Sequence, residues 1–202
     1  MREAALDSIG CIVMASGLSA RYGRDKLLET LDGKTVLQHT VGSLTAAGLK
    51  PLVVTRSPDI LALAARAGIA CVRHDGPRKC DTMRVGLENL PADAAGYLFM
   101  PADQPLVLPD SLRRMADQFL SCPGRAVRLA FGDAAGSPVL FPAACRGALL
   151  AYAGDRGGAD VLKARQIPCD AVRASYAWEL WDVDTPGQME RVREAYRGYF
   201  GR

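Results

Sequence analysis

The sequence predicts an α/β protein with a mostly parallel sheet. Short apolar runs that are typical of buried strands alternate with longer segments in which apolar residues recur at helical spacing. The strand-like runs are 9–14, 51–55, 68–73, 96–100, 126–131 and 139–141. The helical segments are 35–47, 57–67, 81–90 and 109–120. Such alternation is typical of parallel strands connected by helices that cover the faces of the sheet.

The helical segments also carry signals for their own boundaries. Segment 35–47 places Val36, Leu37 and Val41 on one side, which predicts an amphipathic helix. Segment 57–67 begins with Ser57 and Pro58, the residue types favoured at the cap and first turn of a helix. We therefore expect helices between the first strands of the sheet.

Composition limits the kind of protein. A length of 202 residues with 49% hydrophobic and 23% charged residues suits one domain, 1–202, with a full core. The net charge of +3, without a run of basic residues, does not favour nucleic acid as a partner. Residues 1–8 do not resemble a signal peptide, and no apolar stretch approaches 18 residues, so we expect a cytoplasmic protein without a membrane partner.

The six cysteines do not point to a metal cluster or a disulfide framework. None forms a C-x-x-C pair, and the two histidines lie far from zinc-finger spacing. Several cysteines stand in apolar runs and are expected to be small buried side chains in a reducing compartment. Cys80 stands in a polar segment, so we expect it in an exposed loop.

The segment 14–26, MASGLSARYGRDK, follows the first strand and carries the most information in the chain. Its glycines, serines, arginines and lysine can direct backbone N–H groups and positive charge at a phosphate. Five residues separate Gly17 from Gly23, and Lys26 lies three beyond, so the spacing excludes a Walker loop. The segment contains no G-x-G, which argues against a dinucleotide-dependent oxidoreductase.

The pattern A-x-G-x-S-x-R-x-G-x-x-K, from Ala15 to Lys26, resembles the first loop of MobA-like nucleotidyltransferases. These enzymes join a nucleotide from CTP or GTP to the molybdenum cofactor, and they have sugar-phosphate relatives. The resemblance covers 9–189 and implies a Rossmann-like three-layer α/β/α nucleotidyltransferase fold. It implies that Arg21 holds the triphosphate and that Lys26 neutralises charge near the α-phosphate, which makes both catalytic. The loop residues implied to bind nucleotide are Ala15, Ser16, Gly17, Ser19, Arg21, Gly23 and Lys26. The variant Ala-Ser-Gly at 15–17 is closer to the cytidylyl branch than to the guanylyl branch.

Two acidic segments resemble the metal-binding parts of the same family. Asp103, in Asp-Gln-Pro after the strand 96–100, matches the aspartate that holds Mg²⁺ and is implied to be catalytic. The segment 182–186, Asp-Val-Asp-Thr-Pro, resembles a block that precedes the last helix of the family. Asp182 or Asp184 is expected to approach the metal, with Asp184 as the second candidate ligand. Thr185 followed by Pro186 equally favours a plain helix start.

Other segments complete the expected site. The resemblance implies that Asp75, after the strand 68–73, contacts the nucleotide, and that Thr82 belongs to a loop that recognises base and ribose. Thr55, at the end of the strand 51–55, is expected to bind the nucleotide as well. His74 is expected to be a surface or turn residue, and His39 a structural one. Departures from the family leave two features open. Residues 78–79, Arg-Lys, replace a glycine and an apolar residue near the base, and Ser137 stands where a histidine is common. The segment 154–159 resembles a G-D-x-G block of the family, and this glycine-rich turn into a helix fits a plain turn or a substrate contact equally well.

The resemblance implies an enzyme that transfers a nucleoside monophosphate to a phosphorylated acceptor such as molybdopterin and releases pyrophosphate with Mg²⁺. It also suggests transient contact with a molybdoenzyme or its chaperone. Two alternatives remain: a sugar- or polyol-phosphate nucleotidyltransferase, and a non-catalytic nucleotide-binding or cofactor-delivery protein of the same fold.

Overall fold

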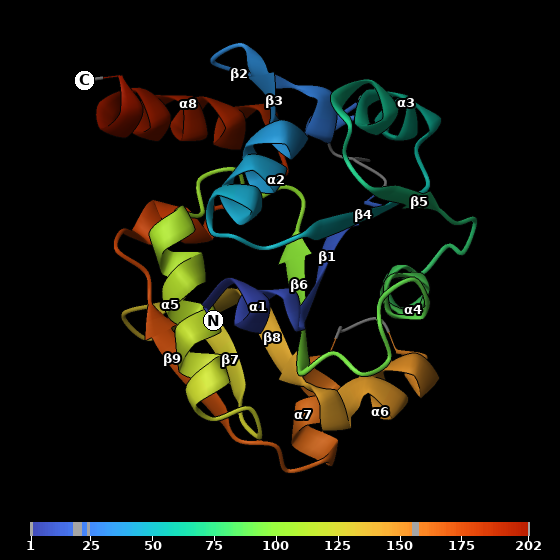
Figure 1. The fold of residues 1–202 in the computed structure, drawn as a ribbon. Coiled ribbons are helices and arrows are strands. Elements are labelled where there is room, and N and C mark those ends of the chain that lie inside the picture. Colours follow the sequence, from blue (N-terminus) through green and yellow to red (C-terminus); the bar gives the residue numbers. More distant parts are fainter. Residues whose placement is uncertain (1, 18–21, 24, 155–157, 202) are drawn as a thin grey trace.

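The computed structural model describes residues 2–17, 22–23, 25–154 and 158–201, and it contains a seven-stranded sheet in the order β5-β4-β1-β6-β8-β7-β9 (Figure 1). Strand β8 is antiparallel to both of its neighbours, whereas the other adjacent pairs are parallel. The predicted mostly parallel sheet is therefore confirmed. The strands are β1 Ile9–Ala15, β4 Pro51–Thr55, β5 Cys71–Arg73, β6 Gly96–Pro101, β7 Ala126–Phe131, β8 Ala134–Pro142 and β9 Cys169–Arg173.

Helices cover both faces of this sheet, which gives the expected three layers (Figure 1). The helices are α1 Arg2–Asp7, α2 Val36–Ala46, α3 Pro58–Ala67, α4 Lys79–Glu88, α5 Pro109–Ser121, α6 Arg146–Ala151, α7 Ala159–Ala164 and α8 Pro186–Phe200. Short 3₁₀ turns stand at η1 Lys26–Leu28, η2 Ala143–Cys145 and η3 Ala177–Leu180, and a small hairpin joins β2 Thr30–Leu31 to β3 Lys34–Thr35.

Alternation along the central strands divides the apolar side chains between two cores. Cys11 and Val13 of β1 pack into the core formed with α2, α5 and α8, while Ile12 packs into the core formed with α4, α6 and α7. Leu98 and Phe99 of β6 divide in the same way. Because successive side chains of a strand point to opposite faces, a strand covered on both faces is apolar throughout. This explains the continuous apolar runs of the sequence.

The predicted helix starts at Ser57 and Thr185 are confirmed, because each side chain accepts a hydrogen bond from the backbone N–H three residues later. The predicted strand 68–73 begins too early. Gly68 adopts a left-handed φ of 65° that ends α3, so β5 starts only at Cys71.

The expectation for Cys80 is wrong. Helix α4 starts at Lys79 rather than at Asp81, since the Asp81 carboxylate accepts a hydrogen bond from the Arg78 backbone N–H and closes the first turn. Cys80 therefore lies inside a helix and is fully buried. Among the residues that the structure describes, no helix combines the length and the apolar character needed to cross a membrane.

Candidate active site

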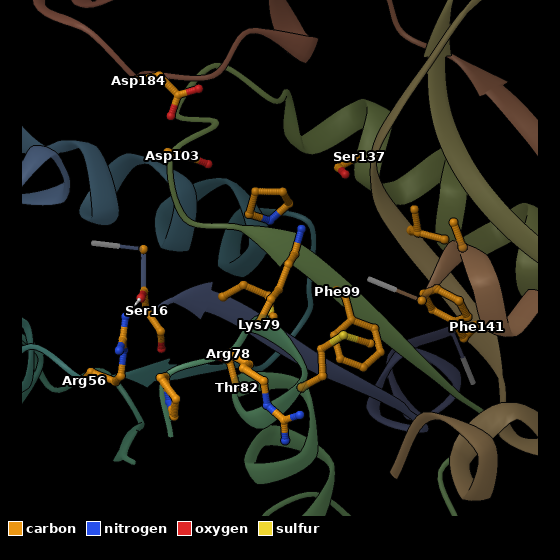
Figure 2. Close-up of a pocket in the computed structure, with 18 of the residues that line it drawn as sticks. Ser16, Arg56, Arg78, Lys79, Thr82, Phe99, Asp103, Ser137, Phe141 and Asp184 are labelled. Carbon is orange, nitrogen blue, oxygen red and sulfur yellow. Dashed lines mark hydrogen bonds between the residues drawn. The ribbon is translucent and has the colours of Figure 1, made fainter. Parts of the chain in front are cut away.

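A cavity of about 570 Å³ lies where the parallel strands β1, β4 and β6 end. Ligands of open α/β sheets bind at this edge, because the loops after several strands converge there. Figure 2 shows Ser16 and Arg56 on one side of the cavity, Ser137 and Phe141 on the other, and Lys79 between them. Its polar lining residues are Ser16, Lys26, Arg56, Arg78, Lys79, Thr82, Asp103, Arg128, Ser137 and Asp184.

Lys26 joins two carboxylates that are far apart in the sequence. Its Nζ lies 2.5 Å from Asp103 Oδ2 and 2.7 Å from Asp184 Oδ1. Burial alone would lower the pKa of the Lys26 ammonium, but the charges and hydrogen bonds of the two aspartates outweigh burial and raise it. Lys26 is therefore a fixed positive charge on the wall of the cavity.

The backbone holds both aspartates in place. Ala102 N–H donates to Met14 O, and the Asp103 carbonyl accepts a hydrogen bond from Val183 N–H, which ties the loop after β6 to the segment before α8. Asp184 lies directly before the capped start of α8, and its N–H donates to Gln188 Oε1. The two carboxylates thus converge on one point from different parts of the chain.

The structure separates the two aspartates of the 182–186 segment. Asp184 lines the cavity, while Asp182 accepts a hydrogen bond from Gln104 Nε2 at 2.8 Å. Burial, followed by repulsion from Asp103 and Asp184, raises the pKa of Asp182. Of this pair, Asp184 is the one that contacts Lys26.

The donor set at Asp103 and Asp184 fits a hard divalent cation. Both carboxylates already converge on a single cationic atom, the Lys26 ammonium, and carboxylate oxygens are ligands that Mg²⁺ prefers. Within the described part of the chain, no group of three or more His, Cys, Asp or Glu side chains is placed to hold a metal. Two carboxylates therefore need further oxygens, and Mg²⁺ commonly takes these from substrate phosphates and water.

The rest of the cavity favours an anion. Its described lining contains five basic side chains against two carboxylates. Arg56 Nη2 donates to Ser16 O at 2.8 Å, which fixes the first residue after β1. Positive charge concentrated around one cavity attracts a polyanion such as a triphosphate.

Comparison with known proteins identifies the family of this chain. Residues 11–171 match the model of the MobA-like NTP transferase domain. This chain belongs to that family. The match includes Lys26 and Asp103, whereas Asp184 lies beyond it.

Solved structures similar to this MobA-like chain cover nearly its whole length. Rv0371c from Mycobacterium tuberculosis H37Rv is 28% identical, with a TM-score of 0.75 over 92% of this chain and 97% of that chain. A manganese complex of Rv0371c is 27% identical, with a TM-score of 0.74 over 93% and 98%. A 4-diphosphocytidyl-2C-methyl-D-erythritol synthase from Anaerococcus prevotii DSM 20548 shares the fold, with 15% identity and a TM-score of 0.73 over 98% and 99%.

A curated relative matches a shorter stretch. The bifunctional enzyme IspD/IspF from Novosphingobium aromaticivorans is 37% identical over 93 residues, which is 43% of this chain and 24% of that enzyme. The chain thus spans about a quarter of the length of the curated relatives it matches.

The structure brings some of the expected site residues to the cavity and leaves others outside it. Of the expected site residues, the cavity is lined by Ser16, Gly17, Lys26, Thr82, Asp103 and Asp184. Four others, all within the described ranges, do not line it: Ala15, Gly23, Thr55 and Asp75. Thr55 is fully buried and donates to Ala15 O, so it connects β4 to β1. The Asp75 side chain is 86% exposed and pairs with Arg73. Ser19, Arg21 and residues 155–157 of the glycine-rich turn lie outside the described residues.

The expectation that His74 is a surface or turn residue is wrong. His74 is 7% exposed, and its Nε2 lies 2.7 Å from Ser16 Oγ and 3.1 Å from Thr82 Oγ1. His39 contacts Leu31 O through Nε2, which agrees with the structural position expected for it.

Several polar residues of this MobA-like site were missed by the sequence analysis. Arg56 follows β4 directly, so the rule that functional residues gather after parallel strands could have found it. Arg128 lies in the middle of β7 and lines the cavity. The alternation of side chains along a strand does not indicate which interior residue reaches a site, so the sequence alone carries no sign of its role.

His74 and His39 should make the folded protein less stable in acid. Burial, followed by the charge of Arg56, lowers the pKa of His74 from its ordinary value of 6.5, and burial lowers the pKa of His39. A base with a lowered pKa binds fewer protons in the folded state, so the free energy of unfolding falls as pH drops below about 6.5. Between about pH 7.5 and 5.5, we expect the Tm of the wild type to fall further than that of His74→Gln, which cannot titrate there. Calorimetry at both pH values tests this, and equal falls would contradict it.

Proposed function

We propose that the chain acts as one nucleotidyltransferase domain, which transfers a nucleoside monophosphate from a triphosphate to a phosphorylated acceptor and releases pyrophosphate. The observation that carries this proposal is the Lys26 ammonium between Asp103 and Asp184, at the edge of a basic cavity. A fixed cation and two convergent carboxylates suit a triphosphate that arrives with a divalent cation.

The reaction needs no protein base. A phosphate oxygen of the acceptor forms a bond to the α-phosphorus, and the bond from that phosphorus to the bridging oxygen of pyrophosphate breaks. A phosphate is already ionised at neutral pH, so catalysis depends on positioning and on charge neutralisation. Lys26 supplies positive charge beside the α-phosphate, while Ser16 and Gly17 approach the triphosphate from the loop after β1. We assign Arg21 to the triphosphate as well.

Asp103 and Asp184 would hold Mg²⁺, which when bound supplies charge neutralisation to the phosphate oxygens. The manganese complex of Rv0371c supports a divalent cation in this family.

CTP is the favoured donor, and GTP is the second. The Ala-Ser-Gly variant at 15–17 supports CTP, as does the cytidyl product in the name of the synthase that shares this fold. That synthase and IspD/IspF favour a sugar- or polyol-phosphate acceptor, while the MobA-like family favours a phosphorylated pterin such as molybdopterin. Only a pterin acceptor would call for contact with a molybdoenzyme or its chaperone.

A thermal-shift screen of CTP, GTP, UTP and ATP, each with Mg²⁺ or with EDTA, tests the proposal. A ligand at 100 times its Kd stabilises by about 2.7 kcal/mol, which corresponds to a Tm increase of roughly 5–10 °C for a chain of this size. We expect CTP to give the largest increase, and EDTA to remove most of it. Pyrophosphate release with pterin, sugar or polyol phosphates then identifies the acceptor.

Two outcomes would change the assignment. Stabilisation without pyrophosphate release from any acceptor would favour a nucleotide-binding or cofactor-delivery protein, which the departures at 78–79 and at Ser137 allow. No stabilisation by any triphosphate would reject a nucleotide site altogether.

A further inference from the structure

His74 joins two walls of the cavity that belong to different elements. It follows β5, and its backbone N–H donates to Thr55 O. Its Nε2 contacts Ser16 Oγ, in the loop after β1, and Thr82 Oγ1, on the first turns of α4. Both hydroxyl residues line the cavity, whereas His74 itself is buried behind them.

The hydrogen bonds of Ser16 decide where the proton of the ring lies. The Ser16 hydroxyl donates its single hydrogen to Val54 O at 3.2 Å, so its oxygen accepts from His74 Nε2–H. With the proton on Nδ1 instead, Ser16 and Thr82 would both have to donate to one Nε2 lone pair, and Ser16 would lose Val54 O. Nε2 of His74 therefore carries a hydrogen.

The surroundings of the ring favour its neutral form, with no hydrogen on Nδ1. Nδ1 is buried and has no hydrogen-bond partner among the described residues, so a second N–H there would be an unsatisfied buried donor. Burial and the charge of Arg56 lower the pKa of His74, whereas the charges of Asp81 and Asp75 raise it. The first two effects are larger, so the pKa of the ring is lowered.

We propose that His74 is a positioning residue for the nucleotide, acting through Ser16 and Thr82. The Nε2–H group of His74 is shared between Ser16 Oγ and Thr82 Oγ1, and it fixes the position of the Ser16 hydroxyl in the loop after β1. Because Thr82 Oγ1 accepts this hydrogen bond, its own hydroxyl hydrogen is free to donate to an acceptor atom of the nucleotide in the cavity. The inference rests on the proposed function, because it assumes that this cavity takes a nucleoside triphosphate.

Two substitutions separate positioning from mere support of the fold. His74→Leu removes the N–H donor at similar side-chain length, while His74→Gln keeps an N–H donor at about the reach of Nε2. We expect the Kd and the KM for CTP with Mg²⁺ to rise about tenfold in His74→Leu, the scale of one hydrogen bond (about 1.4 kcal/mol), while kcat stays within about threefold. His74→Gln should stay within about threefold of the wild type in all three constants.

Calorimetric titration of folded protein gives Kd and stoichiometry, and pyrophosphate release gives KM and kcat. A purely structural role would reduce the active fraction, and so kcat, at unchanged Kd and KM. His39→Leu is the matched control, because His39 is a partly buried histidine that does not line the cavity, and its KM should not change.

The possible failures are distinguishable. A wild type that binds CTP while His74→Leu binds it equally well overturns the positioning role alone, as does a His74→Gln variant that is as impaired as His74→Leu. A wild type that binds none of the four triphosphates overturns the proposed function and the role of His74 with it.

Discussion

Replacing Lys26 with alanine should lower turnover about 100-fold or more, the scale for loss of one group that stabilises charge in a transition state. Lys26 is buried, with Nζ in contact with both Asp103 and Asp184, so its charge is fixed before any ligand binds. Such preorganised charge contributes more than a mobile surface charge, because little reorganisation is needed during the reaction. Initial rates of pyrophosphate release at saturating CTP and Mg²⁺ measure the effect.

A matched control separates this role from loss of general positive charge. Lys50→Ala removes a lysine that is 78% exposed and pairs with Asp7 on the surface, so its kcat should equal that of the wild type. Unchanged turnover in Lys26→Ala would refute the role of the ammonium, provided that circular dichroism shows the variant folded.

Replacing Glu179 with leucine should lower the free energy of unfolding by about 3–5 kcal/mol. The three hydrogen bonds to its charged carboxylate contribute about 1.5–3 kcal/mol each, and burial of the apolar leucine side chain recovers part of that loss, about 1.5–3 kcal/mol. Glu179 is fully buried. Its Oε2 accepts from Leu108 N–H at the start of α5, and its Oε1 accepts from the N–H groups of Ser175 and Tyr176. The leucine would leave these donors without their acceptor.

Urea denaturation monitored by circular dichroism measures this loss as a lower midpoint at an unchanged slope. Glu179→Gln should lose less, because one amide oxygen still accepts. Glu190→Leu, on the exposed side of α8, is the control and should stay within about 0.5 kcal/mol of the wild type. A wild-type midpoint for Glu179→Leu would show that the three N–H groups find other partners.

The central fold could be predicted because its signals are local. Apolar runs mark the buried strands, and Ser57 and Thr185 mark helix starts through their own side chains. The peripheral elements could not be predicted in the same way. Helices α6 and α7 have six residues each, too few for a clear period, and β9 alternates between exposed and half-buried positions at the border of the sheet.

The site could be predicted only in part, for a related reason. The resemblance pointed to Lys26, Asp103 and Asp184, and the structure brings all three into contact. His74 was misjudged because its burial depends on Ser16 and Thr82, which come from other elements. A single sequence gives no measure of such long-range contacts, so a lone histidine after a strand looks like a turn residue.

The order of the segments around Lys26 also has a consequence for synthesis of the protein. The loop that carries Lys26 and the loop that carries Asp103 are translated early, but Asp184 belongs to the segment before the last helix, α8. A growing chain can pair β1 with β4 and β6 long before it contains the second carboxylate. Protein arrested or truncated before residue 184 would therefore carry most of the sheet while Lys26 lacked one of its two counter-ions.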